Sequence, residues 1–260
     1  MSRRRALVTG ASSGIGEAYA KRLAAEGYDL VVVARRRDRL ERLAAALDVD
    51  VRPLQADLGT PEGLEAVRVA ALEEPLDLLV NNAALAHYAP FGELDPARAQ
   101  ELVQLNVLAP VLLTRAVLPG MVERGSGAVV NVASLLAWSG EWEAPHLPRR
   151  AVYAATKSFL VTFTQVLAAE LAGSGVRVQV LCPGVVRTEF HTRQGMDMAG
   201  RTRMEPQDVV AASLADLERG AVVSVPGLED EAALTAIATA QAALAGSTGA
   251  VGLAARYASG

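Results

Sequence analysis

Short apolar runs alternate with longer segments of helical spacing along most of the chain. Several runs are rich in β-branched residues and apolar on both faces, which is typical of strands buried in a parallel sheet. The runs predicted as strands are residues 6–9, 30–34, 51–55, 76–80, 128–133, 176–181 and 221–225. The segments predicted as helices include residues 17–26, 38–47, 96–118, 152–171 and 206–218.

This alternation predicts an α/β fold with a doubly wound parallel sheet of about seven strands. Right-handed crossovers place helices on both faces of such a sheet. We expect one domain over residues 1–260, ending in a C-terminal helix and tail at 228–260. Because ligands bind beyond the carboxyl ends of parallel strands, the irregular segments 137–150 and 185–205 are predicted as substrate-side loops.

Charge and composition exclude several classes of protein. The chain has 25 Lys and Arg against 29 Asp and Glu, a net charge of −4, so it has no general attraction for nucleic acid. The charge-free stretch 232–255 is mostly alanine, interrupted by Thr, Gln and Gly, and does not predict a membrane helix. Cys182 is the single cysteine and cannot form an internal disulfide, so we expect a cytoplasmic protein. His87, His146 and His191 lie far apart in the sequence, and we predict no metal site.

A glycine-rich turn joins the first predicted strand to the helix that follows it. Gly10, Gly14 and Gly16 lie in the run Thr9-Gly10-Ala11-Ser12-Ser13-Gly14-Ile15-Gly16. Glycine lets the backbone approach a pyrophosphate, and a helix N-terminus offers free N–H groups to it. The turn therefore predicts a dinucleotide site, with a purely structural tight turn as the alternative.

Tyr153 and Lys157 lie four residues apart on a predicted helix, so both side chains project from the same face. A nearby ammonium lowers the pKa of a phenol, as a general acid/base requires. Ser134 ends the preceding strand at the sheet's carboxyl edge. Elsewhere such a pair would be an ordinary surface pair, but this context favours catalysis.

Taken together, these motifs resemble the short-chain dehydrogenase/reductase family, whose members have a Rossmann fold. The resemblance extends over about residues 5–225 and rests on Thr9, Gly10, Gly14, Ile15, Gly16, Asp57, Asn81, Asn82, Ala83, Asn106, Ser134, Tyr153, Lys157, Pro183 and Gly184. It implies catalytic roles for four of these residues. Tyr153 would exchange a proton with a carbonyl or alcohol, and Ser134 would bind the substrate oxygen. Lys157 would lower the tyrosine pKa and hold the nicotinamide ribose, while Asn106 would join a proton relay.

One feature of the sequence supports the relay. Pro110 lies four residues after Asn106 and has no N–H, so the Asn106 carbonyl lacks its helical partner and is available to a water molecule. The alternatives are an ordinary polar helix residue and a plain proline kink.

The cofactor implied by the resemblance is NADP(H). Where NAD-dependent relatives carry Asp, this chain has Ala34, followed by Arg35, Arg36 and Arg37. An arginine here accommodates a 2′-phosphate. We expect Arg35, with Ser12 or Ser13, to contact the phosphate and Arg36 and Arg37 to be solvated. The full set of expected cofactor-binding residues is Gly10, Ser12, Ser13, Gly14, Ile15, Gly16, Arg35, Asp57, Leu58, Asn82, Ala83, Tyr153, Lys157, Pro183, Gly184, Val186 and Thr188.

Two departures from the family pattern bear on the site. Ala84 replaces a family glycine, which matters if that position needs positive φ or touches the cofactor. Tyr153 lies 19 positions after Ser134, farther than in relatives, so extra residues fall within 140–150. They could form a substrate lid, belong to a subunit interface or misalign Ser134.

The sequence thus predicts an NADP(H)-dependent oxidoreductase that transfers hydride between the nicotinamide and a carbonyl or alcohol of a small, mostly apolar substrate. The residues expected to line the cavity are His87, Tyr88, Phe91, Trp138, Trp142, His146, Phe190, His191, Met196 and Met198. Relatives imply a homodimer or homotetramer. One alternative is a non-catalytic NADP(H)-binding regulator. The other, a nucleotide-sugar epimerase, is disfavoured by the glycine spacing.

Overall fold

The computed structural model describes the chain except residues 1–2, 141–146, 247–248, 250–251, 255–256 and 258–260. The chain divides into two compact units, Met1–Pro226 and Gly227–Gly260. The larger unit holds every predicted site residue, and the smaller contains α9 (Ala232–Ala245), the expected C-terminal helix. The single domain over 1–260 stays a prediction.

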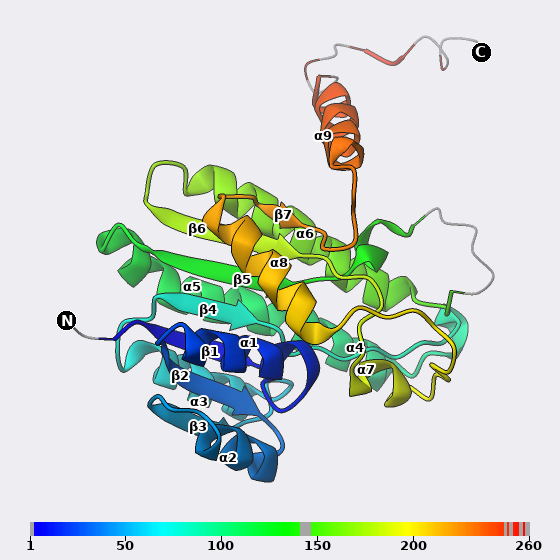
Figure 1. The fold of residues 1–260 in the computed structure, drawn as a ribbon. Coiled ribbons are helices and arrows are strands. Elements are labelled where there is room, and N and C mark those ends of the chain that lie inside the picture. Colours follow the sequence, from blue (N-terminus) through cyan, green and yellow to red (C-terminus); the bar gives the residue numbers. More distant parts are fainter. Residues whose placement is uncertain (1–2, 141–146, 247–248, 250–251, 255–256, 258–260) are drawn as a thin grey trace. The chain divides into compact units, whose positions relative to one another are not determined.

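A seven-stranded parallel sheet forms the centre of the larger unit, in the order β3-β2-β1-β4-β5-β6-β7 (Figure 1). Its strands are β1 (Arg5–Thr9), β2 (Asp29–Ala34), β3 (Val51–Gln55), β4 (Leu78–Asn81), β5 (Gly127–Val132), β6 (Val176–Leu181) and β7 (Val223–Ser224). The order reverses between β1 and β4, and this switch point is where an open α/β sheet forms its ligand crevice. The doubly wound Rossmann fold is confirmed.

Helices cover both faces of this sheet. The α-helices of the larger unit are α1 (Gly14–Ala25), α2 (Arg37–Ala45), α3 (Pro61–Leu72), α4 (Pro96–Val103), α5 (Ala109–Glu123), α6 (Ala151–Glu170), α7 (Glu189–Thr192) and α8 (Pro206–Glu218). Residues of α1, α2 and α8 share one core cluster with one face of the sheet, while residues of α3, α4, α5 and α6 share another with the opposite face. Figure 1 shows α1 and α8 crossing the near face.

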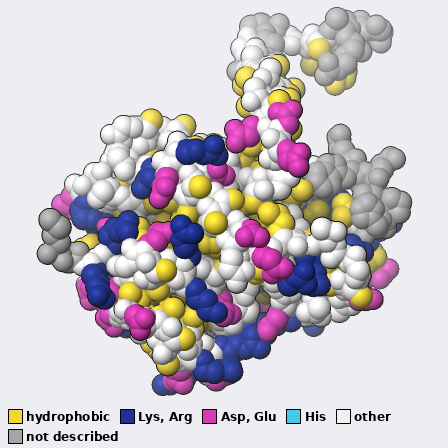
Figure 2. Space-filling view, in the orientation of Figure 1, with side chains coloured by type: hydrophobic (Ala, Val, Ile, Leu, Met, Phe, Trp, Pro, Cys, Tyr) yellow, Lys and Arg dark blue, Asp and Glu magenta, His cyan; other side chains and the backbone are white. Residues whose placement is uncertain are grey.

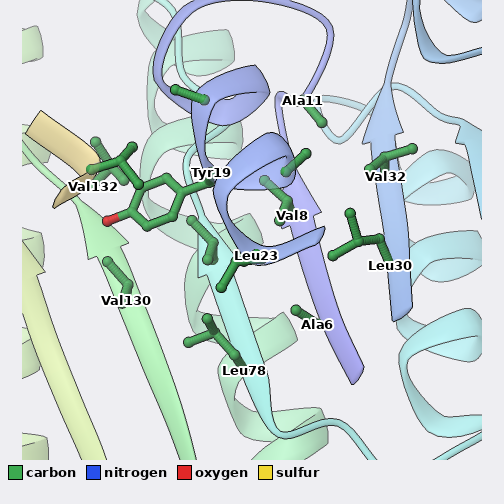
Figure 3. Close-up of a cluster of buried hydrophobic side chains, with 14 of the residues drawn as sticks. Ala6, Val8, Ala11, Tyr19, Leu23, Leu30, Val32, Leu78, Val130 and Val132 are labelled. Atoms are coloured by element: carbon green, nitrogen blue, oxygen red, sulfur yellow. The ribbon is translucent and has the colours of Figure 1, made fainter. Parts of the chain in front are cut away.

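The first of these core clusters holds the glycine-turn helix against the sheet. Figure 3 shows Tyr19 of α1 lying beside Val130 and Val132 of β5. The Tyr19 hydroxyl donates a hydrogen bond of 2.5 Å to Ser213 Oγ of α8, which in turn donates to Gln179 Oε1 of β6 at 2.6 Å. These buried polar contacts fix α1 and α8 to each other and to β6.

The predicted helix 96–118 differs most from the structure. It is interrupted after α4 by a single π-helical turn, Gln104–Leu108, and continues as α5 to Glu123. Pro110 has no N–H to complete the α-helical ladder, which explains the break at this place. Asp95 caps the start of this helix, since its Oδ1 accepts from Ala97 N at 2.8 Å.

The helix α3 was not among the expected segments, although the sequence signals its start. Thr60 Oγ1 accepts a hydrogen bond from Gly63 N at 3.1 Å, and Pro61 occupies the first turn. A threonine cap followed by proline is a helix-start signal.

Among the described residues, the segment Pro96–Glu123 is long and apolar enough to span a membrane. Its buried side chains, including Leu102, Leu113 and Met121, belong to the second core cluster. Packing against the sheet therefore accounts for its apolar character. Elsewhere, basic and acidic side chains alternate over the face in Figure 2, in keeping with the nearly balanced charge.

Candidate active site

A cavity of about 700 Å³ lies at the carboxyl ends of the central strands. This volume is within the range of small-molecule and cofactor sites, about 300–1,000 Å³. Of the predicted site residues, the cavity is lined by Gly10, Ser12, Ser13, Gly14, Ile15, Arg35, Asp57, Leu58, Asn82, Ala83, Ser134, Tyr153, Lys157, Pro183, Gly184, Val186 and Thr188. Gly16 and Asn106 are outside the lining.

The glycine turn is braced against β4 by polar contacts. Thr9 Oγ1 accepts from the backbone N–H groups of Asn82 and Ala83 at 2.9 and 3.0 Å, and donates to Val80 O at 3.2 Å. Asn82 Nδ2 donates to Thr9 O at 2.8 Å. The turn is thus held rigidly before any ligand arrives, as a preorganised site requires.

Glycine is required at two positions of this turn. Gly10 and Gly14 have φ of +69° and +60°, a region that disfavours residues with a Cβ. A Cβ on Gly14 would also lie 2.7 Å from Thr188 Cγ2. Open backbone at the start of α1, facing a cavity of this size, fits a nicotinamide dinucleotide whose pyrophosphate would be held by the turn's N–H groups. Ala84 does not have positive φ, but it lines the cavity, so its methyl group stands where a cofactor could touch it.

The arginines after β2 are placed differently from expectation. Arg35 lines the cavity with a side chain 60% exposed, and its Nη1 lies 3.7 Å from Asp57 Oδ2. Arg36, expected to be solvated, has a side chain only 23% exposed. Its Nη2 donates to the hydroxyls of Ser12 and Ser13, both at 2.9 Å. The expectation for Arg36 was wrong, because the fold brings the glycine turn within reach of its guanidinium.

Ser134, Tyr153 and Lys157 meet at the other end of the cavity. Ser134 and Tyr153 both line this part of the cavity, and Ser134 lies close enough to the Tyr153 phenol to lower its pKa. Lys157 Nζ lies 5.8 Å from the centre of the Tyr153 ring and donates to Val132 O at 2.9 Å. Despite the extra residues before Tyr153, Ser134 and Tyr153 thus face the same cavity.

Burial governs the ionisation of this group. Tyr153 and Lys157 are 5% and 2% exposed. Desolvation raises the pKa of Tyr153 and lowers the pKa of Lys157 to about 8. Hydrogen bonding from Ser134 opposes the rise at Tyr153, whereas the expected lowering by Lys157 is not seen in the protein alone. The lysine charge is itself disfavoured by burial, which explains the difference.

Asn106 is fully buried in the π-helical turn and connects α6 to the segment after β4. Its Oδ1 accepts from Leu85 N at 3.1 Å, and its Nδ2 donates to Leu85 O at 3.0 Å and Thr156 Oγ1 at 3.2 Å. Its side chain thus fixes two elements that line the cavity.

Only one of the two predicted substrate-side loops lines the cavity in the part of the chain that the structure describes. Segment 185–205 contributes to the cavity through α7, whose Phe190 ring lies 6.1 Å from the Tyr153 ring. No described residue of 137–150 lines the cavity, and residues 141–146, including Trp142 and His146, lie outside the described part. The ends of this segment are joined by Arg150, whose Nε donates to Ser139 Oγ at 2.8 Å.

Sequence reasoning missed part of the cavity wall and misplaced other residues. His87 and His191 line the cavity as expected, but Arg98 and Glu101 of α4 do so as well. His87 Nε2 lies 3.0 Å from Glu101 Oε2, and Arg98 Nη1 lies 3.2 Å from His87 Nδ1. Arg98 and Glu101 lie in the first turns of the helix that begins after Asp95, and this position in the sequence could have indicated that they face the cavity.

Several aromatic and Met residues expected at the cavity are elsewhere. Tyr88 and Met196 are not in the lining, although the Tyr88 ring lies edge-on to the Tyr153 ring at 5.6 Å. Phe91 is 71% exposed, Met198 is buried and Trp138 packs on a third core cluster. In the described part of the chain, no group of three His, Cys, Asp or Glu residues could hold a metal ion.

Comparisons with known proteins agree with this architecture. The family model for short chain dehydrogenase matches residues 4–199. A short-chain dehydrogenase from Sphingobium yanoikuyae, solved in complex with NADPH, superposes with a TM-score of 0.92 at 36% identity over 98% of this chain and 99% of its own. The bulky-bulky ketone specific alcohol dehydrogenase from Comamonas testosteroni gives 0.86 at 31% identity, covering 98% of both chains.

A curated relative is similar over most of its length. The NADP-dependent 3-hydroxy acid dehydrogenase YdfG of Salmonella typhimurium is 34% identical over 218 residues, which cover 79% of this chain and 86% of that protein. These matches, together with the parallel sheet and the glycine turn, show that the chain belongs to the short-chain dehydrogenase/reductase family of oxidoreductases.

Proposed function

We propose that this protein is an NADP(H)-dependent oxidoreductase that interconverts a carbonyl and an alcohol, with Tyr153 as the general acid/base. The observation that carries the proposal is that Ser134, Tyr153 and Lys157 line the same cavity as the glycine turn. When bound, a nicotinamide cofactor supplies or accepts the hydride.

The chain's own residues would handle the proton and the substrate oxygen. Tyr153 donates its phenolic proton to the carbonyl oxygen as the alcohol forms, and accepts it in the reverse direction. Ser134 donates a hydrogen bond to the same oxygen. Lys157, charged below its pKa of about 8, would stabilise the phenolate that remains and hold the nicotinamide ribose.

Preference for NADP(H) is supported by basic residues at the cofactor end of the cavity. Arg35, Arg36 and Arg193 all line the cavity, and no carboxylate occupies the end of β2, where Ala34 lies. An arginine at this position suits a 2′-phosphate. The NADPH bound in the Sphingobium structure points the same way.

The substrate we propose is small and mostly apolar. Leu85, Leu105 and Phe190 provide apolar surface in the cavity, with His87 and Glu101 as polar points. We also propose a homodimer or homotetramer in the cytoplasm. Exposed apolar side chains on the helices flanking β4 and β5 support the oligomer: Leu108, Leu112, Phe159 and Val166.

The test is oxidation of NADPH by purified protein with a panel of ketones and aldehydes, compared with Tyr153→Phe. Loss of a general acid/base should lower kcat by about 10²- to 10⁴-fold while NADPH binding persists. Tyr28→Phe, a half-buried tyrosine that contacts Arg4, is the matched control and should retain activity. If NADPH binds but no compound in a broad panel oxidises it, the regulator replaces the enzyme as the better proposal.

A further inference from the structure

The carboxylate of Glu189 lies within a cluster of arginines at the cofactor end of the cavity. Its Oε1 is 2.5 Å from Arg39 Nη1, and its Oε2 is 2.9 Å from Arg36 Nη1 and 3.2 Å from Arg193 Nη2. These partners come from the end of β2, from α2 and from the segment after α7. Hydrogen bonds from Arg39 and Arg36 lower the pKa of Glu189 to about 2, so the carboxylate is charged at neutral pH.

Three guanidinium groups, those of Arg36, Arg39 and Arg193, contact the one carboxylate of Glu189, while Glu17 and Asp38 also act on Arg39. The pKa of Arg193 is lowered by burial and by the charges of Arg36, Arg39 and Arg35, with Glu189 acting in the opposite direction. Arg36, Arg39 and Arg35 thus lie close enough to Arg193 to act on its charge. Such a group of neighbouring cations favours binding of a further anion.

Arg36 has few donors left for that anion. A guanidinium has five N–H donors. In Arg36, Nε and Nη2 face the glycine turn, donating to Ser12 Oγ at 3.1 and 2.9 Å, and Nη1 donates to Glu189. A phosphate that approaches Arg36 from the cavity therefore meets an edge of the guanidinium already paired with a carboxylate.

We propose that Glu189 is a specificity-determining residue that competes with the cofactor's 2′-phosphate for the arginine cluster and so limits the preference for NADPH over NADH. Glu189 lines the same cavity as Ser12, Ser13 and Arg35. A phosphate dianion placed there is repelled by the carboxylate, whereas the neutral ribose hydroxyl of NADH is not. This inference rests on the proposed function, in which the cofactor lies with its phosphate at the end of β2.

The experiment measures binding of NADPH and NADH to the purified protein by fluorescence titration, with no substrate present. Glu189→Gln keeps the shape of the side chain and removes its charge. We expect it to bind NADPH about three- to tenfold more tightly and NADH within twofold of the wild type. Since exposed charges are screened by salt, the gain should shrink as ionic strength is raised.

Glu205→Gln is the matched control, because it removes one negative charge from an ion pair with Arg187 that lies outside the cavity lining. It should change neither affinity. Weaker NADPH binding in Glu189→Gln would mean that Glu189 positions Arg36 instead of competing with phosphate, and would overturn the proposal. Equal changes for NADPH and NADH would do the same. Failure of the carbonyl panel, with the affinities changed as expected, would reject the enzymatic proposal and leave this one standing.

Discussion

The two ends of the cavity are built on different physical principles. At the end that we propose as catalytic, Tyr153, Lys157 and Asn106 are almost completely buried, and Lys157 and Asn106 donate hydrogen bonds to backbone carbonyl groups. At the end that we propose for the cofactor, charged side chains are partly exposed and form ion pairs, such as Arg35 with Asp57 and Arg36 with Glu189. At the first end, loss of a buried hydrogen bond costs much free energy. At the second, solvent and salt weaken the exposed ion pairs, so the loss of one costs little.

The largest effect in this comparison is expected at Asn106. Replacing it by Leu leaves the N–H and C=O of Leu85 without their side-chain partners in a buried place. An unsatisfied buried group costs about 1–3 kcal/mol, so Asn106→Leu should lower the free energy of unfolding by about 2–5 kcal/mol. Urea denaturation measures this. Gln104→Leu, a partly exposed amide in the same π-helical turn, should cost far less; equal costs would show that Asn106 has no special structural role.

A pH-dependent effect of intermediate size is expected at Lys157. Its pKa is about 8 in the folded protein against 10.5 for the ordinary group, so between these values the unfolded chain binds more protons. Stability should therefore rise with pH from about 8 to 10.5, by at most about 3 kcal/mol at 1.36 kcal/mol per pKa unit.

The variant Lys157→Met isolates this effect, because a methionine side chain does not titrate between pH 8 and 10.5. Urea denaturation at several pH values should find the variant more stable than the wild type at pH 7, with the difference shrinking as pH rises through this window. A constant difference across the window would contradict the lowered pKa.

The smallest effects are expected from the two arginines at the cofactor end. Arg35→Ala removes an exposed guanidinium and should weaken NADPH binding by about tenfold, or 1.4 kcal/mol, while leaving NADH nearly unchanged. Arg36→Ala also removes the hydrogen bonds to Ser12 and Ser13, so it should weaken both cofactors by loosening the glycine turn. Fluorescence titration with both nucleotides tests this pair. An unchanged ratio of the two affinities in Arg35→Ala would refute the assignment of Arg35 to the phosphate.

Local patterns in the sequence were sufficient for the fold and for much of the candidate site. Short apolar runs indicated the strands, most clearly β1, β2, β4, β5 and β6, since a strand buried on both faces needs apolar residues at successive positions. The glycine turn and the spacing from Tyr153 to Lys157 are equally local. Their position after particular strands predicted that they would meet at one edge of the sheet, as they do.

Tertiary structure alone decided which charges pair and which groups lose their solvent. Glu189 lies 153 positions after Arg36, and nothing in either local sequence indicates that they share an ion pair. Likewise, the lowered pKa of Lys157 depends on the strands and helices that surround it. Hydrophobic periodicity acts within one element, whereas Coulomb forces and desolvation depend on distances between elements, which are set only when the chain has folded.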